Sequence, residues 1–266
     1  MQTKPEFPDH IQDQPVLFLS DVHLGAFTVS VDQALEDEII KLIDHAEKHQ
    51  IRIVILGDLF DYWMEYPSYI PKLGERLRTR FREYHSAVGP SLYVTGNHDC
   101  WTLSHFHELG FDVEPEYRVL KLGDKTGLLL HGDGLSDAGM NYPHPLLHRF
   151  LRNERFISIY QKILPPSAGI SLMRLFSRIS KFREGFTDNT EKLDNWAQQT
   201  LNSSRFDIII CGHHHHQRFV QTNTGLYINL GAYFNDHTLA LYSDHKLTMV
   251  NWPGSQYELL PVTSHS

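Results

Sequence analysis

Five short, nearly continuous apolar runs constrain the fold most strongly, because each is as long as a strand and each ends directly in a polar cluster. The runs cover residues 16–20, 51–56, 91–95, 128–130 and 206–211. Such runs are typical of strands buried on both faces. Segments with helical periodicity lie between the first three, over 31–49 and 71–88. Alternating strands and helices predict crossover units in a layered α/β fold.

The polar clusters at the ends of these runs carry residue types that bind metal ions. The candidate ligands are Asp21, His23, Asp58, Asn97, His131, His213 and His215. The carboxyl ends of neighbouring strands in an open α/β sheet converge on one crevice, so residues distant in sequence can meet there. In Asp21-x-His23 and in His213-x-His215, an extended backbone would place the two named side chains on the same side of the chain, so each pair could bind one metal ion. Mixed carboxylate, imidazole and amide ligands suit Mn²⁺, Fe or Zn²⁺.

The composition excludes several classes of protein. A chain of 266 residues with 41% hydrophobic content is sufficient for one main domain with a large core. The net charge of -8 argues against a surface that coats nucleic acid, so we expect no stable nucleic-acid partner. No signal-peptide pattern or apolar stretch of about 18 residues occurs. We expect a cytoplasmic protein whose Cys100 and Cys211 are reduced thiols.

The stretch from 143 to 202 differs from the rest in pattern and in charge. Its apolar residues recur at helical spacing, and 144–183 contains eight arginines and lysines against one glutamate. An apolar stripe opposite a basic one suits a lid over an acyl chain attached to phosphate, or a helix at a membrane surface. A helical hairpin that packs on the body with its basic face in water is an alternative.

These patterns predict how the chain is divided. We expect an N-terminal extension at 1–14, a main domain formed by 15–142 and 203–260, and a helical insertion or cap at 143–202. After Gly212, short apolar runs between turn residues predict an antiparallel meander that ends the main domain.

The five polar clusters form an ordered series, and that series resembles a known superfamily. The clusters are Asp21-x-His23, Gly57-Asp58-x-x-Asp61, Gly96-Asn97-His98-Asp99, His131 and Gly212-His213-x-His215. Over residues 16–240 this series is similar to the calcineurin-like metallophosphoesterase superfamily. The resemblance implies a four-layer α/β/β/α sandwich with a helical insertion. It also implies two divalent ions, with Mn²⁺ preferred over Fe or Zn.

The resemblance distributes the ligands between the two ions and gives roles to their neighbours. Asp21, His23 and His215 would hold one ion and Asn97, His131 and His213 the other, with Asp58 bridging both. Catalysis would involve His98, as general acid for the leaving oxygen or as a phosphate binder, with Asp99 orienting it. Asp61 and Asp133 would fix ligand imidazoles or backbone. A structural hydrogen bond to a neighbouring loop is the alternative for His98.

Further stretches narrow the resemblance to one branch. Residues 18–25, 57–63 and 131–135, together with the basic insertion, resemble the UDP-2,3-diacylglucosamine pyrophosphatases of lipid A biosynthesis. That resemblance implies hydrolysis of the diphosphate to UMP and 2,3-diacylglucosamine 1-phosphate, an insertion that covers the acyl chains, and peripheral contact with the inner membrane surface through the insertion. The implied substrate-binding residues are Asn97, His98, Tyr142, Arg174, Arg178 and Lys181.

One departure from that branch leaves the substrate open. Well-known members have Arg where this chain has His98, which is the residue of the general superfamily. A soluble phosphodiesterase or nucleotide pyrophosphatase of the same superfamily is therefore an alternative. A non-enzymatic scaffold, as in the metallophosphoesterase-like retromer subunit, is a third hypothesis, and it predicts that no metal binds.

Overall fold

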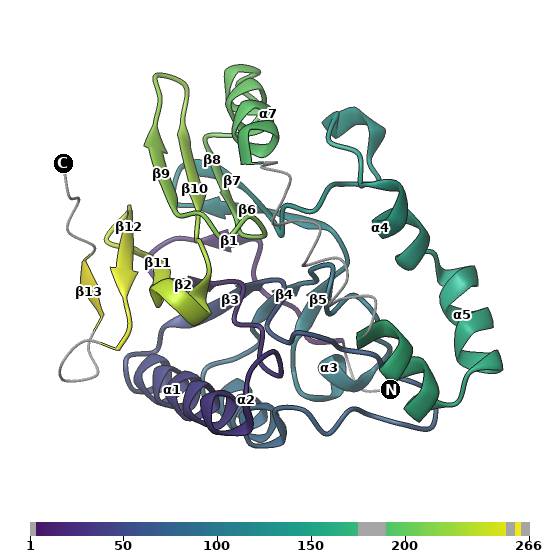
Figure 1. The fold of residues 1–266 in the computed structure, drawn as a ribbon. Coiled ribbons are helices and arrows are strands. Elements are labelled where there is room, and N and C mark those ends of the chain that lie inside the picture. Colours follow the sequence, from purple (N-terminus) through teal and green to yellow (C-terminus); the bar gives the residue numbers. More distant parts are fainter. Residues whose placement is uncertain (1–3, 175–189, 254–258, 262–266) are drawn as a thin grey trace.

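Two β-sheets lie face to face at the centre of the protein, and helices cover both outer faces (Figure 1). The computed structural model describes residues 4–174, 190–253 and 259–261. Alternation along β2 (Val16–Leu19) shows why the sheets stack. Val16 and Phe18 pack between the two sheets, whereas Leu17 and Leu19 pack under the helices. The predicted four-layer α/β/β/α sandwich is confirmed.

The first sheet contains the parallel strands that the apolar runs predicted. Its order is β13-β12-β11-β2-β3-β4-β5, and β2 to β5 are parallel. Helices α1 (Val29–Lys48), α2 (Glu75–Ala87) and α3 (His105–Glu108) connect these parallel strands. The remaining strands are β3 (Arg52–Leu56), β4 (Leu92–Val94), β5 (Asp112–Glu114), β11 (Thr238–Ser243), β12 (Lys246–Asn251) and β13 (Leu260–Pro261).

The second sheet has the order β1-β6-β7-β8-β10-β9. Its first strand falls in the predicted N-terminal extension. This segment packs against the two sheets, as the 2% exposed fractions of Phe7 and Ile11 show. The strands are β1 (His10–Ile11), β6 (Tyr117–Leu122), β7 (Lys125–Leu130), β8 (Ile208–Cys211), β9 (Arg218–Gln221) and β10 (Leu226–Asn229).

The predicted meander after Gly212 is wrong in one respect. β9 and β10 form an antiparallel pair, but β10 also lies parallel to β8, and β11 belongs to the other sheet. The chain changes sheets through the short helix α8 (Tyr233–Asp236). All four residues of β10 are buried, which requires a neighbouring strand on each side and cover on both faces.

Between β7 and β8 the described chain is helical. It contains η1 (Ala138–Met140), α4 (Leu146–Leu151), α5 (Glu154–Ile163), a helix over 166–174, and α7 (Thr190–Asn202). We call residues 146–174 the cap, because α4 and α5 lie to one side of the two sheets (Figure 1). In α7, Leu193 and Trp196 pack on the second sheet, so α7 forms the fourth layer.

The cap boundaries at 143 and 202, and its function as a lid, stay predictions. Arg178 and Lys181, which the sequence places on the insertion, lie outside the described residues. Across the described ranges, no helix has both the length and the apolar character needed to cross a membrane.

Candidate metal centre

The ends of five strands, three from one sheet and two from the other, bring the seven predicted ligands together. Asp21 and His23 follow β2, Asp58 follows β3, and Asn97 follows β4. From the second sheet, His131 follows β7, and His213 and His215 follow β8. The centre therefore lies where the edges of two stacked sheets meet, and not in the crevice of one open sheet.

The first group of predicted ligands consists of Asp21, His23 and His215. His23 Nε2 lies 3.1 Å from His215 Nε2, and His215 Nε2 lies 3.3 Å from Asp21 Oδ1. Asp21 Oδ1 is buried and has no hydrogen-bond partner among the described residues. A buried carboxylate oxygen without a donor, faced by two imidazole nitrogens, needs a cation to compensate it. The residues present fit a divalent ion.

The second group is built around His131. Its Nε2 lies 3.1 Å from Asn97 Oδ1 and 3.3 Å from Asp58 Oδ2, and the His131 and His213 ring centroids are 5.0 Å apart. Asp58 Oδ2 is also 3.7 Å from His23 Nε2. Asp58 therefore lies between the two groups, where a bridging ligand has to lie.

Hydrogen bonds from the far side of two imidazoles orient them toward the centre. His131 Nδ1 lies 2.8 Å from the Leu56 carbonyl oxygen, and His23 Nδ1 lies 3.2 Å from Asp61 Oδ1. With Nδ1–H donating to these oxygens, the Nε2 lone pair faces the centre. This contact gives Asp61 the supporting position that the sequence predicted.

The carboxylates at the centre favour positive charge on two of its imidazoles, those of His23 and His131. Burial lowers the pKa of His23, but the nearby carboxylates of Asp21 and Asp61 outweigh that effect and raise the pKa to about 9. Burial also opposes the charge on His131, yet the Asp58 carboxylate raises the pKa of His131 to about 10. The field that attracts protons to these imidazoles also attracts a metal ion.

The backbone at the centre is strained. Five of the seven predicted ligands have φ between 51° and 73°, a region that residues with a Cβ rarely adopt. These five are Asp21, His23, Asp58, His213 and His215. Two glycines allow close approach, because a Cβ on Gly96 would lie 2.1 Å from Asp58 Oδ1 and one on Gly212 would lie 2.1 Å from Asp21 Oδ2. Such strain is common at functional sites.

His98 and Asp99 lie next to Asn97 in the sequence, but they make hydrogen bonds to different parts of the protein. His98 Nδ1 lies 2.8 Å from the Asp61 carbonyl oxygen, and the His98 backbone N–H donates to Asp58 Oδ1 at 3.0 Å. The fully buried Asp99 carboxylate accepts from three donors, which are Leu59 N, Gly96 N and the Tyr93 hydroxyl. The Asp61 carbonyl thus orients the His98 ring, and Asp99 holds the loop that carries Asn97 and His98.

The structure also places two of the predicted substrate-binding residues. Tyr142 is 6% exposed, its hydroxyl donates to the Gly132 carbonyl at 2.8 Å, and its ring stacks on Trp196. It therefore has a packing role, and its contact with substrate stays a prediction. The exposed Arg174 places its guanidinium 4.5 Å from the ring centroid of Tyr62, the residue after Asp61.

The basic segment contains a functional candidate that the sequence did not distinguish. In the sequence, Arg152 is one of eight arginines and lysines in residues 144–183. In the structure its side chain is only 10% exposed and forms an ion pair with Asp133. Sequence offers no signal for this burial, because the partner lies 19 residues away on another element.

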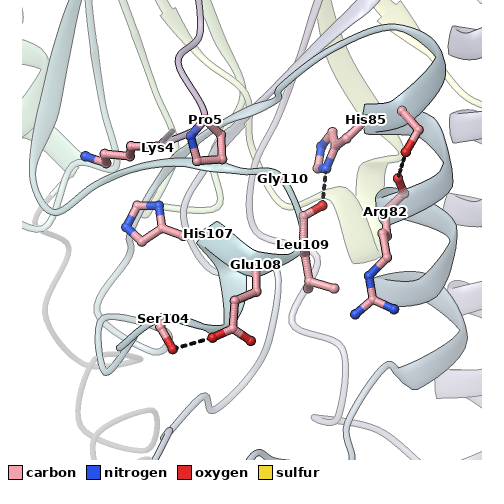
Figure 2. A pocket seen from close by; sticks show the side chains of 10 residues that line it. Lys4, Pro5, Arg82, His85, Ser104, His107, Glu108, Leu109 and Gly110 are labelled. Atoms are coloured by element: carbon pink, nitrogen blue, oxygen red, sulfur yellow. Dashed lines mark hydrogen bonds between the residues drawn. The ribbon is translucent and has the colours of Figure 1, made fainter. Parts of the chain in front are cut away.

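An open groove elsewhere on the surface contains none of these residues. Its volume is about 630 Å³, and it lies between the N-terminal segment, the end of α2 and α3 (Figure 2). We assign it no part in the chemistry of the centre.

The family model described as calcineurin-like phosphoesterase matches residues 14–217. This chain belongs to the calcineurin-like phosphoesterases. Every predicted ligand lies within the matched range, so the ordered series of clusters and the geometry of the centre agree with the family. The chain is a metal-dependent phosphoester hydrolase.

Curated relatives share part of the sequence of this phosphoesterase. A UDP-2,3-diacylglucosamine hydrolase of Neisseria gonorrhoeae is 25% identical over 235 residues, which cover 87% of this chain and 95% of that protein. A protein of the same name from Porphyromonas gingivalis is 26% identical over 151 residues, 56% of this chain and 57% of that protein. Among solved structures, the Escherichia coli phosphoesterase Yfce is 14% identical with a TM-score of 0.47, covering 95% of this chain and 100% of that one.

Proposed function

We propose that this phosphoesterase hydrolyses the diphosphate of UDP-2,3-diacylglucosamine, releasing UMP and 2,3-diacylglucosamine 1-phosphate. The names of the curated relatives support this substrate class. We further propose that the ions are Mn²⁺, and that the enzyme works in the cytoplasm on lipid at the inner membrane surface.

The observation that carries the proposal is an apolar cap attached beside the metal centre. Large apolar side chains are exposed on α4 and α5, with exposed fractions of 82% for Leu146, 53% for Leu147 and 71% for Ile163. Several exposed apolar side chains on two neighbouring helices are consistent with a partner or ligand that covers them. Acyl chains attached to the reacting diphosphate have the required chemistry.

Hydrogen bonds fix the cap against loops of the centre, and two of them involve Trp101 and Gln161. Trp101 Nε1 donates to the Leu151 carbonyl at 2.8 Å, and Gln161 Nε2 donates to the Glu65 carbonyl at 2.5 Å. Trp101 lies in the loop that begins with Asn97 and His98. A substrate that extends from the centre onto the cap would therefore place its diphosphate and its acyl chains on neighbouring surfaces.

We propose that the seven predicted ligands hold two metal ions at which the phosphoryl group reacts. Asp21, His23 and His215 would bind one ion, Asn97, His131 and His213 the other, and Asp58 both. When bound, the ions supply charge that polarises phosphoryl oxygens and lowers the pKa of water.

The role we propose for His98 is to act on the substrate through Nε2. Its Nδ1 hydrogen bond to the Asp61 carbonyl fixes the ring at 4.9 Å, centroid to centroid, from the His23 ring. A proton on Nε2 would be donated to a phosphoryl oxygen or to the leaving oxygen. Of the three predicted basic substrate-binding residues, Arg174 is the one within the described residues, and we propose that it binds the phosphate groups of the lipid.

The experiment that tests this function compares two substrates. Mn²⁺-loaded protein is assayed for UMP release from UDP-2,3-diacylglucosamine in mixed micelles, and for cleavage of bis-p-nitrophenyl phosphate. Asp58→Ala serves as the inactive control. UMP release that exceeds diester cleavage in kcat/KM supports the proposal, and diester cleavage without UMP release contradicts it.

A second candidate is a soluble phosphodiesterase or nucleotide pyrophosphatase of the same superfamily. The observation that favours it is His98 in Gly-Asn-His-Asp, where the lipid-hydrolase branch resembled by the sequence has Arg. For this candidate, the apolar surface of the cap would not affect turnover.

A further inference from the structure

Arg152, whose side chain is only 10% exposed, joins the cap to two loops of the metal centre. It follows the last residue of α4, and every nitrogen of its guanidinium donates a hydrogen bond. Nη1 donates to the Pro115 carbonyl at 2.6 Å and to Thr95 Oγ1 at 3.2 Å. Nη2 donates to the Thr95 carbonyl at 3.2 Å, and Nε and Nη2 both donate to the Asp133 carboxylate at 3.1–3.2 Å.

The partners of Arg152 lie immediately next to the second group of ligands. Thr95 is two residues before Asn97, at the end of β4 in one sheet. Asp133 is two residues after His131, beyond the end of β7 in the other sheet. Arg152 therefore connects the two sheets at the point where Asn97 Oδ1 and His131 Nε2 are 3.1 Å apart.

The ion pair between Arg152 and Asp133 is largely shielded from solvent. The side chains of Arg152 and Asp133 are 10% and 3% exposed. Removing one member of such a pair leaves an uncompensated buried charge, whereas the intact pair fixes geometry through directional bonds.

His148, which lies within α4, also contacts the Asp133 carboxylate. His148 Nδ1 lies 3.4 Å from Asp133 Oδ2, and the His148 and His213 ring centroids are 6.3 Å apart. Asp133, His144 and His148 also come close enough to hold an ion. We reject a third metal here, because Arg152 already places its positive charge on both Asp133 oxygens.

We propose that Arg152 is a positioning residue for the second metal ion and that it couples cap docking to binding of that ion. The proposal rests on the ligand set proposed above. With the cap docked, Arg152 holds the Asn97 and His131 loops at the spacing the ion needs. By linkage, an ion at those ligands must stabilise the docked cap to the same extent.

The test measures metal binding, not activity. Arg152→Met is compared with Arg155→Met, which removes the same charge from an exposed position of the cap. Mn²⁺ is titrated by calorimetry, and bound metal is counted by elemental analysis. We expect one of the two sites to weaken by about 10- to 100-fold in Arg152→Met. The other site, and both sites of Arg155→Met, should match the wild type.

A double variant guards against a folding defect. Asp133→Asn with Arg152→Met removes both members of the charge pair, and it also lacks the bonds to Thr95 and Pro115. We expect this folded variant also to bind one ion weakly. Wild-type affinity at both sites would overturn the positioning role.

Hydrogen exchange tests the coupling. Mn²⁺ should slow amide exchange in α4 and α5 about tenfold in the wild type and not in Arg152→Met. Unchanged exchange in the wild type would overturn the coupling. Fewer than two ions in the wild-type protein would overturn the proposed ligand set, and this inference with it. Two tightly bound ions in both the wild type and Arg152→Met would overturn this inference alone.

Discussion

His23 and His215 are 192 residues apart in the sequence, yet their Nε2 atoms lie 3.1 Å apart. His23 Nδ1 lies 3.2 Å from Asp61 Oδ1, where its N–H can donate. Two imidazole nitrogens at this separation require a proton or a cation between them, since two lone pairs would repel each other. Asp21 Oδ1, 3.3 Å from His215 Nε2, adds a carboxylate charge. A divalent ion held by these three side chains would supply the positive charge and stabilise the centre.

Removal of divalent ions should therefore lower the melting temperature. An ion present at about 100 times its Kd stabilises a protein by about 2.7 kcal/mol, which corresponds to a few degrees for a chain of this size. The measurement is thermal unfolding after chelation with EDTA and dialysis, and again after addition of Mn²⁺. An unchanged melting temperature on re-addition would contradict ion binding at this centre.

Asp58→Ala and His98→Ala should separate metal binding from chemistry. Loss of the Asp58 carboxylate removes the ligand shared by both groups, so we expect loss of bound metal and of activity. His98→Ala should retain both ions while turnover falls about 10²- to 10⁴-fold, the usual contribution of a general acid. Elemental analysis and kcat on a soluble diester measure the two effects. Equal metal loss in both variants would refute the division of roles.

Tyr142→Phe distinguishes packing from substrate contact. The change removes the hydrogen bond to the Gly132 carbonyl, so the free energy of unfolding should fall by about 1 kcal/mol. Tyr66→Phe is the matched control, because the buried Tyr66 hydroxyl has no hydrogen-bond partner among the described residues. Urea unfolding and steady-state kinetics on the lipid substrate are measured. A KM raised tenfold with unchanged stability would instead assign Tyr142 to substrate binding.

Polar substitutions on α4 should impair hydrolysis of the lipid alone. Leu146→Ser with Leu147→Ser removes two exposed apolar side chains, each of which would contribute roughly 1.5 kcal/mol when covered by an acyl chain. We expect KM for UDP-2,3-diacylglucosamine to rise at least about tenfold, with cleavage of a soluble diester unchanged. Val220→Ser on β9, 39% exposed, is the control. Equal effects on both substrates would count against acyl binding by the cap.

His85 should make the fold sensitive to acid. Burial lowers the pKa of His85 to about 4, its Nδ1–H donates to the Leu109 carbonyl at 2.7 Å, and its buried Nε2 has no partner among the described residues (Figure 2). Because the folded pKa lies below the ordinary value, the stability from neutral His85 is complete above about pH 6.5. It is lost as the pH falls toward 4.

His85→Phe tests this pH dependence. The variant lacks the titrating group, so its free energy of unfolding should decline less between pH 7 and pH 4.5, by about 1 to 3 kcal/mol. Urea unfolding at a series of pH values provides the measurement. Identical slopes for the variant and the wild type would show that His85 does not set the acid sensitivity.

The elements that local pattern defines were predicted well. The apolar runs gave β2, β3, β4, β7 and β8, because a strand buried on both faces must be apolar throughout. Their arrangement in two sheets did not follow from pattern, since the five runs look alike. The same limit explains the error at β10 and β11. Turn residues between two strands do not show that the chain leaves one sheet for the other.

Side-chain roles were predicted less completely than side-chain positions. The resemblance implied that Asp99 orients His98, but the three hydrogen bonds that the Asp99 carboxylate accepts come from Leu59, Gly96 and Tyr93, which only the folded chain brings together. Arg152 could not be separated from the exposed cap arginines, because its low exposure depends on Thr95 and Asp133, which lie in the loops after two different strands.

The left-handed backbone of five predicted ligands has a consequence for the lifetime of the protein in the cell. Each strained residue costs about 1 to 3 kcal/mol, so the metal-free chain has a smaller margin against unfolding than its packed cores suggest. Ions at the centre restore part of that margin. Copies made when metal is scarce would unfold more often and reach proteases sooner, so metal supply would set the abundance of the enzyme as well as its rate.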